Sequence, residues 1–574
     1  MTMQEHRSTK RKRTTLACDA CRARRTKCDS QRPSCHYCQT HGVICIYQEP
    51  PVEPPSRTDI WDSVEEELNA LNKRLDQLIS LILPAQSFSP DLRAREPRDE
   101  YETLANQENS PFDLPSKLLG NSSIMQVLGL DADFTQVLIR GERVTASEGH
   151  VNAGTRMLIV HHQHTVNALA AFSAHVHIWY PILPSGFSRE YFEVLAGSLL
   201  PSSETCLSLL VAAIGLTVEE DETISSTPYF ETALASLPII LSECSVRSVQ
   251  CLLLIGLYYS CLLKPCQAHD YCLIASSKIQ NIFKSGLEGD GPNIVEQTRR
   301  VYWAVLLLEN EIGAQLDVPK SGIWDLDEHV PLPLCQQTWQ FTPEGTSPGI
   351  AASVSPGSAI STTTVVENTR SYFLAEIAMR RMLHRCNTAV QATATGQYVY
   401  APNIALELEH QLEEWYHYLP EVNRFEKGDV VQPLELIDIP PCPLSNFLRV
   451  QYYCCRLSIY WPAIYQAIQD GSVSDPLLDH CQRFIDSFVL LSPSIISAFH
   501  DCRVNRWTIF VSIFITSVAA ITAANVPCLR ELCSPRFYQC IQASGRAQQT
   551  ILQKSASLMM LQEVLEERLS VAGL

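Results

Sequence analysis

Residues 18–45 read CDACRARRTKCDSQRPSCHYCQTHGVIC, and their six cysteines give the clearest signal in the chain. Cys18, Cys21 and Cys28 form the pattern C-x2-C-x6-C. Each has a counterpart 17 positions later, namely Cys35, Cys38 and Cys45. The duplicated spacing indicates a tandem repeat of one metal-binding unit, because clustered cysteines in a reducing compartment are more often metal ligands than disulfides.

The number of thiolates predicts how many metal ions they hold. A structural zinc ion takes four ligands in a tetrahedron and favours thiolate. Three cysteines per repeat leave each ion one ligand short, so two zinc ions need two shared sulfurs. Cys18 and Cys35 occupy the equivalent first positions and are the expected bridges. The segment is too short to build an apolar core, so zinc binding would also supply its folding energy.

Two alternatives to the two-zinc cluster remain open. Cys18, Cys21, His36 and His41 have the spacing of a finger with two Cys and two His ligands. That choice leaves four cysteines unused, and neither histidine follows the 17-residue repeat. Purely structural or redox cysteines would make the repeat a coincidence. We therefore favour two zinc ions bound by all six cysteines.

Residues 18–45 resemble the fungal zinc binuclear-cluster transcription factors, whose pattern is C-x2-C-x6-C-x5-12-C-x2-C-x6-8-C. The resemblance implies a short helix whose end enters the major groove of double-stranded DNA and reads a CGG triplet. The base-reading residues would be Arg24 and Arg25, with Lys27 and Arg22 on phosphates or beside the cluster. Arginine can donate a bidentate pair to guanine O6 and N7. The alternative is a solvated basic face that only neutralises the cluster.

Charge is unevenly distributed along the 574 residues, whose net charge is −18. Residues 1–48 contain ten Lys or Arg and three acidic residues, whereas the other 526 residues contain 34 and 59. A basic head on an acidic body indicates that the head meets a polyanion. Within the basic arm, residues 1–17, we expect a nuclear import signal or a DNA-backbone contact at Lys10, Arg11, Lys12 and Arg13. The expected localisation is the nucleus.

A heptad pattern follows the cysteines. Residues 46–60 form a Pro-rich linker containing EPPVEPPS, which favours an extended conformation. Residues 61–83 then place apolar side chains at alternating spacings of three and four. This pattern predicts a short coiled-coil helix that makes a homodimer; a helix docked on its own body is the alternative. The dimerisation residues would be Val64, Leu68, Leu71, Leu75, Leu78 and Ile82.

The rest of the chain is predicted to be mainly all-α. We expect a polar linker over 84–164, a helical domain over 165–335, a flexible loop over 336–370 and further helices of the same domain over 371–574. Repeated strand alternation with hairpin turns is missing. The clearest helical segments are 206–216, 249–263, 296–316, 371–386, 404–418 and 444–468.

A second resemblance covers this body. The segments Trp179–Leu183, Arg299–Trp303 with Glu309, and Pro319–Ile323 resemble the fungal-specific transcription factor domain, or middle homology region. The resemblance implies a domain that regulates activity and sometimes senses a metabolite. The transcription machinery and a small-molecule effector are therefore further expected partners. For Trp303, Arg299 and Glu309 we expect packing and an internal ion pair.

The body contains one uncharged stretch long enough to cross a bilayer, residues 507–529. Ser, Thr and Asn interrupt it and an Arg flanks each end, so we expect a buried core helix and no membrane partner. A cluster of histidines is expected to pack or lie at the surface rather than bind metal: His161, His162, His164, His175 and His177.

No catalytic motif of the type H-E-x-x-H, G-x-G-x-x-G or G-x4-G-K-[ST] is present, so we expect no enzyme. The expected function is a sequence-specific, zinc-dependent DNA-binding transcription factor at RNA polymerase II promoters. It would read CGG half-sites as a dimer and regulate a metabolic pathway or gene cluster, for example in secondary metabolism. The alternative is a helical enzyme or metabolite-binding protein whose zinc segment serves only assembly.

Overall fold

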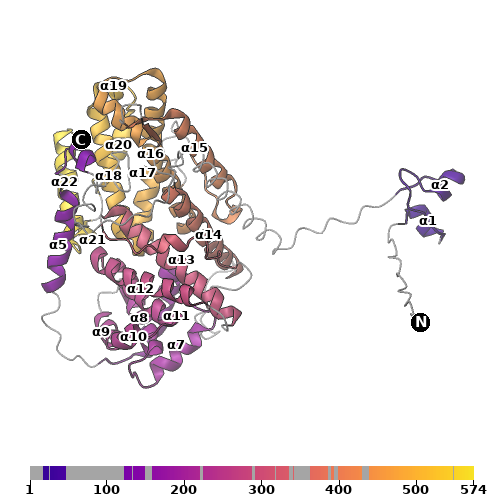
Figure 1. Cartoon of the computed structure of the whole chain (residues 1–574), viewed down its shortest axis with the longest axis horizontal. Coiled ribbons are helices and arrows are strands. Elements are labelled where there is room, and N and C mark those ends of the chain that lie inside the picture. Colours follow the sequence, from indigo (N-terminus) through magenta and orange to yellow (C-terminus); the bar gives the residue numbers. More distant parts are fainter. Residues whose placement is uncertain are drawn as a thin grey trace, which may run out of the picture. The chain divides into compact units, whose positions relative to one another are not determined.

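The computed structural model divides the chain into two compact units, residues 1–63 and 64–574 (Figure 1). The described residues, apart from a few isolated positions and short gaps at 220–223, 287–290 and 547–548, are 17–46, 122–148, 158–334, 341, 362–385, 389–392, 398–428 and 439–573.

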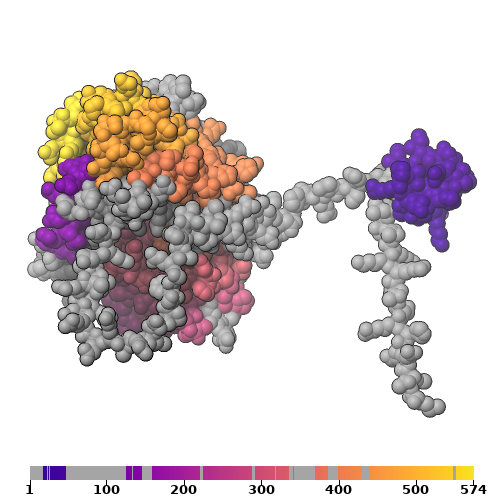
Figure 2. All heavy atoms as spheres, turned by 45° about the horizontal axis from the view of Figure 1, so that its top comes forward, coloured from indigo at the N-terminus to yellow at the C-terminus, as the bar shows by residue number. Residues whose placement is uncertain are grey.

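The described residues of the first unit, here called the head and drawn in indigo in Figure 2, form two matching halves. Helix α1 (Asp19–Ala23) and helix α2 (His36–Thr40) lie 17 positions apart, as the cysteines do. Their backbone hydrogen bonds repeat with the same offset: Thr26 N donates to Cys21 O, and Val43 N donates to Cys38 O, both at 3.0 Å. The repeat in the sequence is therefore also a repeat of local structure.

The first half of the second unit, here called the body, is a stack of consecutive helices that pack on their neighbours (Figure 1). Most residues of α8 and α11 are buried, because other helices surround both of them. The helices are α6 (His162–Phe172), continued by the π-helix η2 (Ser173–His177), α7 (Phe187–Ala196), α8 (Ser203–Glu219), α9 (Thr227–Leu234), α10 (Leu237–Ser242), α11 (Val246–Cys261), α12 (Pro265–Ser285) and α13 (Pro292–Gln315).

The second half of the body packs two long antiparallel helices, α16 and α17, along each other and against α18. Contacts of α13 with α14 and α18 join the two halves. The elements are the 3-10 turn η3 (Ile323–Leu326), α14 (Thr362–Arg385), α15 (Pro402–His417), η5 (Glu421–Asn423), α16 (Pro443–Asp470), α17 (Asp475–Asp501), η7 (Arg503–Asn505), α18 (Arg506–Asn525), α19 (Pro527–Arg530), α20 (Pro535–Ser544), α21 (Gln549–Leu552), α22 (Ala556–Val571) and a two-stranded hairpin, β1 (Val390–Ala392) with β2 (Tyr398–Tyr400).

The helical fold class predicted from the sequence is confirmed. Each of the six segments singled out lies in a helix, from 206–216 in α8 to 444–468 in α16. The apolar stretch forms α18, in the middle of the body. Residues Arg503–Asn525 are apolar and long enough to cross a membrane, yet 89% of their most apolar window is buried by protein. They are a core helix here.

Two expected boundaries differ from the structure. Helices α4 (Ser122–Val127) and α5 (Phe134–Glu148) lie inside the stretch predicted as a polar linker, 84–164, and α6 also begins there. Helix α14 begins at Thr362, inside the predicted loop 336–370.

Helix α5 is held in place by residues far along the chain. It packs on α22, the C-terminal helix, and Figure 1 shows the two side by side. Leu138 is fully buried, and the ring of Phe134 stacks on Phe514 at 5.9 Å. Although the segment of α5 is polar in composition, it therefore carries a narrow apolar stripe. The residues on which this stripe packs lie far along the chain and come close only in the folded protein.

Candidate metal centre and DNA-binding surface

The six predicted zinc ligands come together in the head. Their sulfurs form two groups of four, and within each group all the atoms lie within 4.8 Å of one another. Cys18 and Cys35, the residues expected to bridge, belong to both groups. The other ligands divide between the groups as Cys21 with Cys28 and Cys38 with Cys45.

The sulfur spacing fits tetrahedral zinc. A tetrahedron of sulfurs about 2.3 Å from its centre has edges of about 3.8 Å. The Cys18 Sγ lies 3.7 Å from Cys35 Sγ and 3.6 Å from Cys38 Sγ. The Cys21 Sγ lies 3.6 Å from Cys35 Sγ. The donor set thus matches two four-coordinate ions that share two thiolates.

Backbone groups of the head shape the cluster electrostatically. The N–H of Cys35 donates to Cys45 Sγ at 3.3 Å and lowers the pKa of Cys45 to about 7. Burial acts in the opposite direction on Cys38, whose thiol pKa is raised. Thiolates packed this closely repel one another, so cations must hold them together. Two zinc ions there would offset four of the six thiolate charges and supply the folding energy of the head.

Residues outside the cysteine pattern complete the head. Ala20, Tyr37 and Val43 pack partly buried against the sulfurs. The carboxylate of Asp29 accepts a hydrogen bond from His36 N, the first residue of α2, at 3.2 Å. The sequence analysis missed these positions, although Ala20 and Tyr37 are related by the same 17-residue offset as the cysteines.

Of the expected DNA-contacting side chains, the structure describes those of Arg24 and Lys27. Arg24 follows the helix directly and is exposed, as is Lys27. Arg22 lies within α1, but its side chain is outside the described residues, and so is the whole of Arg25. The basic surface is therefore anchored to the cluster through Cys21 on one side and Cys28 on the other.

Several other predicted sites fall outside the described residues. They are the import segment Lys10, Arg11, Lys12 and Arg13, and the dimerisation residues Val64, Leu68, Leu71, Leu75, Leu78 and Ile82. These remain predictions from the sequence.

In the body, the motif residues serve packing. Trp303 is fully buried, its Nε1 donates to Pro331 O at 3.1 Å, and the Arg381 guanidinium lies 4.7 Å from the ring centroid. Packing is thus confirmed for Trp303. Glu309 and Arg299 do not pair with each other: serines hold Glu309, and Arg299 Nη1 lies 3.9 Å from Glu296 Oε2.

The neighbouring arginine links two of the motifs. Buried Arg300 donates from Nη1 to Pro181 O at 2.8 Å and to Leu183 O at 3.4 Å. The segment around Trp179 is thereby fixed to α13. Sequence spacing alone could not decide which of the adjacent residues Arg299 and Arg300 points inward.

Comparison with known proteins agrees with this geometry. Residues 16–53 match the fungal Zn(2)-Cys(6) binuclear cluster domain, and residues 169–417 match the fungal specific transcription factor domain. A protein of Aspergillus rugulosus assigned as transcription factor ecdB is 45% identical over 578 residues, which is 98% of this chain and 99% of the relative.

Two further relatives are more distant or shorter in their match. An uncharacterised transcriptional regulatory protein of Schizosaccharomyces pombe is 19% identical over 91% of this chain and 73% of its own. The Zn(2)-C6 fungal-type transcription factor afumD of Aspergillus fumigatus is 52% identical over 42 residues, 7% of this chain and 11% of its own. No solved structure matches.

The fold and the thiolate site define a DNA-binding regulator built from a metal-held head and a helical body. The chain belongs to the fungal Zn(2)-C6 transcription factors. It is therefore a regulator of transcription rather than an enzyme, and its cofactor is zinc, two ions per chain.

Proposed function

We propose that this regulator recognises CGG triplets in nuclear DNA, with Arg24 and Arg25 reading guanines and Arg22 and Lys27 contacting phosphates. The observation that carries the proposal is the position of Arg24. This side chain is exposed at the end of a helix tied to the cluster by Cys21. The cluster fixes the backbone beside Arg24 while its guanidinium stays exposed, so it can be presented to base edges in a groove.

We propose that two chains act together. A single head contacts few base pairs, so selectivity among genomic sites requires two half-sites. The heptad over 61–83 supplies a candidate dimer contact in its apolar positions. The Pro-rich stretch 46–60 allows a span on the order of 45 Å between each head and its helix, at about 3.1 Å per residue.

The cellular role follows from the same residues. We propose that Lys10–Arg13 directs import into the nucleus, where the protein acts on RNA polymerase II promoters of a metabolic pathway or gene cluster. Support for the pathway comes from the family resemblance. Genome-wide occupancy mapping tests it: peaks should carry paired CGG triplets and gather near co-regulated metabolic genes. Peaks that are scattered and lack CGG would contradict it.

Base reading is tested by electrophoretic shifts with duplexes that carry two CGG triplets. Arg24→Ala and Arg25→Ala should each weaken binding about tenfold to a hundredfold with zinc content unchanged, since a bidentate pair contributes about 1–3 kcal/mol of discrimination. Arg32→Ala is the matched control, because Arg32 is an exposed cation of the same head beyond the α1 region. If all three variants weaken binding equally, on any sequence, the arginines act only through charge.

Dimerisation is tested separately. Leu71→Pro should weaken binding to a two-triplet duplex more than to a single-triplet duplex, because it breaks the helix that joins the heads. Lys73→Ala, at a charged position of the same segment, is the control. Sedimentation of the wild-type chain as a monomer under the binding conditions would contradict the dimer.

A further inference from the structure

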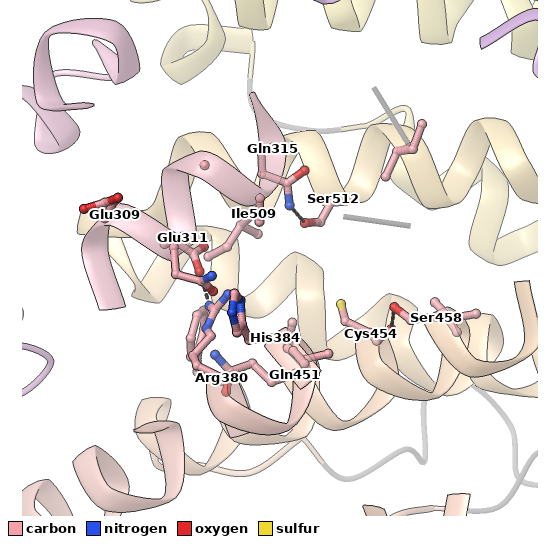
Figure 3. A pocket seen from close by; sticks show the side chains of 18 of the residues that line it. Glu309, Glu311, Gln315, Arg380, His384, Gln451, Cys454, Ser458, Ile509 and Ser512 are labelled. Carbon is pink, nitrogen blue, oxygen red and sulfur yellow. Dashed lines mark hydrogen bonds and ion pairs between the residues drawn. The ribbon is translucent and has the colours of Figure 1, made fainter. Parts of the chain in front are cut away.

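The body contains a pocket where α13, α14, α16, α17 and α18 meet (Figure 3). Its cavity volume is about 130 Å³, comparable with an engineered apolar cavity of about 150 Å³ that takes up benzene. This volume is enough for a small organic molecule. The residues that line it come from positions between His269 and Thr516, so no short motif encodes the pocket.

Most of the pocket wall is apolar. The aliphatic and aromatic side chains that line it include Leu383, Phe447, Val450, Leu457, Ile509 and Ile515. One side carries a flat surface, because the rings of Trp324 and His384 stack with centroids 4.1 Å apart and planes 3° from parallel. Such walls favour a molecule with an apolar and partly planar skeleton.

The charged groups in the buried part of the pocket already have partners within the protein. Arg380 forms ion pairs with both Glu311 and Glu376, the latter at 2.8 Å. Glu311 also accepts from Thr508. Glu309 accepts hydrogen bonds from Ser321 through its backbone N–H and its hydroxyl. The exposed Lys320 is a further charged lining residue, so an anionic group could pair with it only where the pocket meets solvent. Burying a charge deeper in the pocket, beside groups that already have partners, would be unfavourable.

The hydroxyls of the pocket have already used their protons. Ser458 donates to Cys454 O at 2.8 Å, Ser512 donates to Thr508 O at 3.0 Å, and Thr516 donates to Ser512 O at 2.7 Å. A hydroxyl has one proton and two lone pairs. Each of these side chains can therefore only accept a hydrogen bond from a ligand.

The two glutamines of the pocket also leave acceptors. Gln451 Nε2 donates to Glu376 Oε1 at 2.6 Å, and since a carboxylate only accepts, the amide oxygen must face away from it. Gln315 Nε2 donates to Ser512 Oγ at 3.0 Å, because the proton of Ser512 is already engaged (Figure 3). Both Oε1 atoms are buried without a hydrogen-bond partner.

His269 adds a further acceptor. It is 2% exposed and makes a hydrogen bond to the backbone of Pro319, which can only be to the carbonyl since proline has no N–H. Its Nε2 has no partner. Nδ1 is therefore the donor, and in the neutral ring Nε2 has a free lone pair. These buried lining groups thus offer acceptors rather than donors.

We propose that this pocket binds an uncharged, largely apolar small molecule that carries hydroxyl or N–H groups, and that those groups donate to the lone pairs of Ser458, Ser512 and Thr516. The amide oxygens and His269 Nε2 are further acceptors, reached by small side-chain rotations. Binding is non-covalent, because burial raises the pKa of the Cys454 thiol to about 12 and keeps it protonated at neutral pH. The inference goes beyond DNA recognition, and its test needs no DNA.

The test uses full-length, zinc-loaded protein and three probes that differ in one group: 1-naphthol, 1-methoxynaphthalene and 1-naphthoate. Calorimetric titration should show 1-naphthol binding at least about fivefold more tightly than its methyl ether, which cannot donate a hydrogen bond. Naphthoate should bind most weakly because of its charge. Equal affinities for the alcohol and the ether would overturn the hydrogen-bond assignment, and no binding of either would overturn the pocket.

A variant that removes two acceptors tests the site. Ser458→Ala with Thr516→Val should weaken 1-naphthol about threefold to tenfold and leave the ether unchanged. The matched control is Ser487→Ala with Thr522→Val. These hydroxyls make the same bond to the carbonyl four residues earlier, at 2.6 and 2.8 Å, but do not line the pocket. A loss in the control as large as in the test variant would overturn the assignment.

A second variant fills the space itself. Gly313 lines the pocket, and a Cβ placed on it meets no atom within 4 Å. Gly313→Phe should therefore reduce the binding of all three probes at least about tenfold. Gly141→Phe is the control, because Gly141 is also a helical glycine with open space, located in α5 away from the pocket. Unchanged probe binding in Gly313→Phe would place the ligand elsewhere.

Discussion

The head and the body reach a defined fold by different physical means. Among the described residues of the head, the fully buried side chains are Cys18, Cys21, Cys35 and Cys38. The body instead buries large side chains such as Trp303, Trp415 and Trp461. Metal–sulfur bonds therefore stabilise the fold of the head, whereas apolar burial stabilises the fold of the body. The two regions should then respond independently to perturbation.

Removal of zinc should produce the largest difference in behaviour between the head and the body. A structural zinc site stabilises its segment by about 10–16 kcal/mol, so chelation should unfold the head and abolish DNA binding. The body should keep its helices and its thermal transition, as circular dichroism would show. A body transition that disappears together with the zinc would show that the two regions fold as one.

Single cysteine substitutions should have a smaller effect, which depends on whether the cysteine binds one zinc ion or bridges two. Cys18→Ser removes a sulfur that belongs to both groups of four and should lose both ions, whereas Cys28→Ser affects one group. Native mass spectrometry of the head within the intact chain measures the zinc stoichiometry. Cys244→Ser, an exposed body cysteine, should retain two ions. Equal zinc loss in the first two variants would argue against bridging.

In the body, a single methyl group should have a measurable effect. Gly215 of α8 lies so close to α6 that an added Cβ would sit 2.0 Å from Ala168 O. Gly215→Ala should destabilise the body by about 2–4 kcal/mol, although alanine normally favours a helix by about 1 kcal/mol. Gly141→Ala, with open space around it, should not destabilise. Urea unfolding of both variants measures the difference, and zinc content should be unchanged.

The smallest expected effect is a pH dependence confined to the body. Burial lowers the pKa of His480, whose ring contacts Tyr400 and Tyr460 and lies near Arg483. The folded state then binds a proton less readily than the unfolded state. Its stability contribution is complete above about pH 6.5 and declines as the pH falls toward the lowered pKa.

His480→Gln should reduce this acid-induced loss by up to about 1 kcal/mol between about pH 7.5 and 5.5, measured by urea unfolding. The exposed His410→Gln is the control. A steeper loss in His480→Gln than in the wild type would reverse the sign of the argument.

The same difference between head and body explains what could be predicted from the sequence. The metal centre could be predicted because its ligands lie within 28 residues and their spacing is set by coordination chemistry. The helices of the body were readable from apolar patterns, such as that of α11. The pocket was not, since its lining spans residues between His269 and Thr516 and arises only from packing. Helix α5 was missed for the same reason.

The attachment of α5 to the C-terminal helix has a consequence for synthesis. Glu142 accepts hydrogen bonds from Ser555 Oγ at 2.6 Å and from Ser557 N at 2.9 Å, more than 400 residues later. On the ribosome, the head can capture its ions as soon as it emerges, while α5 must wait until Ser555 and Ser557 have been made. A premature stop codon at Ser555 would leave Glu142 without these two partners, and quality-control proteases would then meet a regulator with an intact head and an unfinished body.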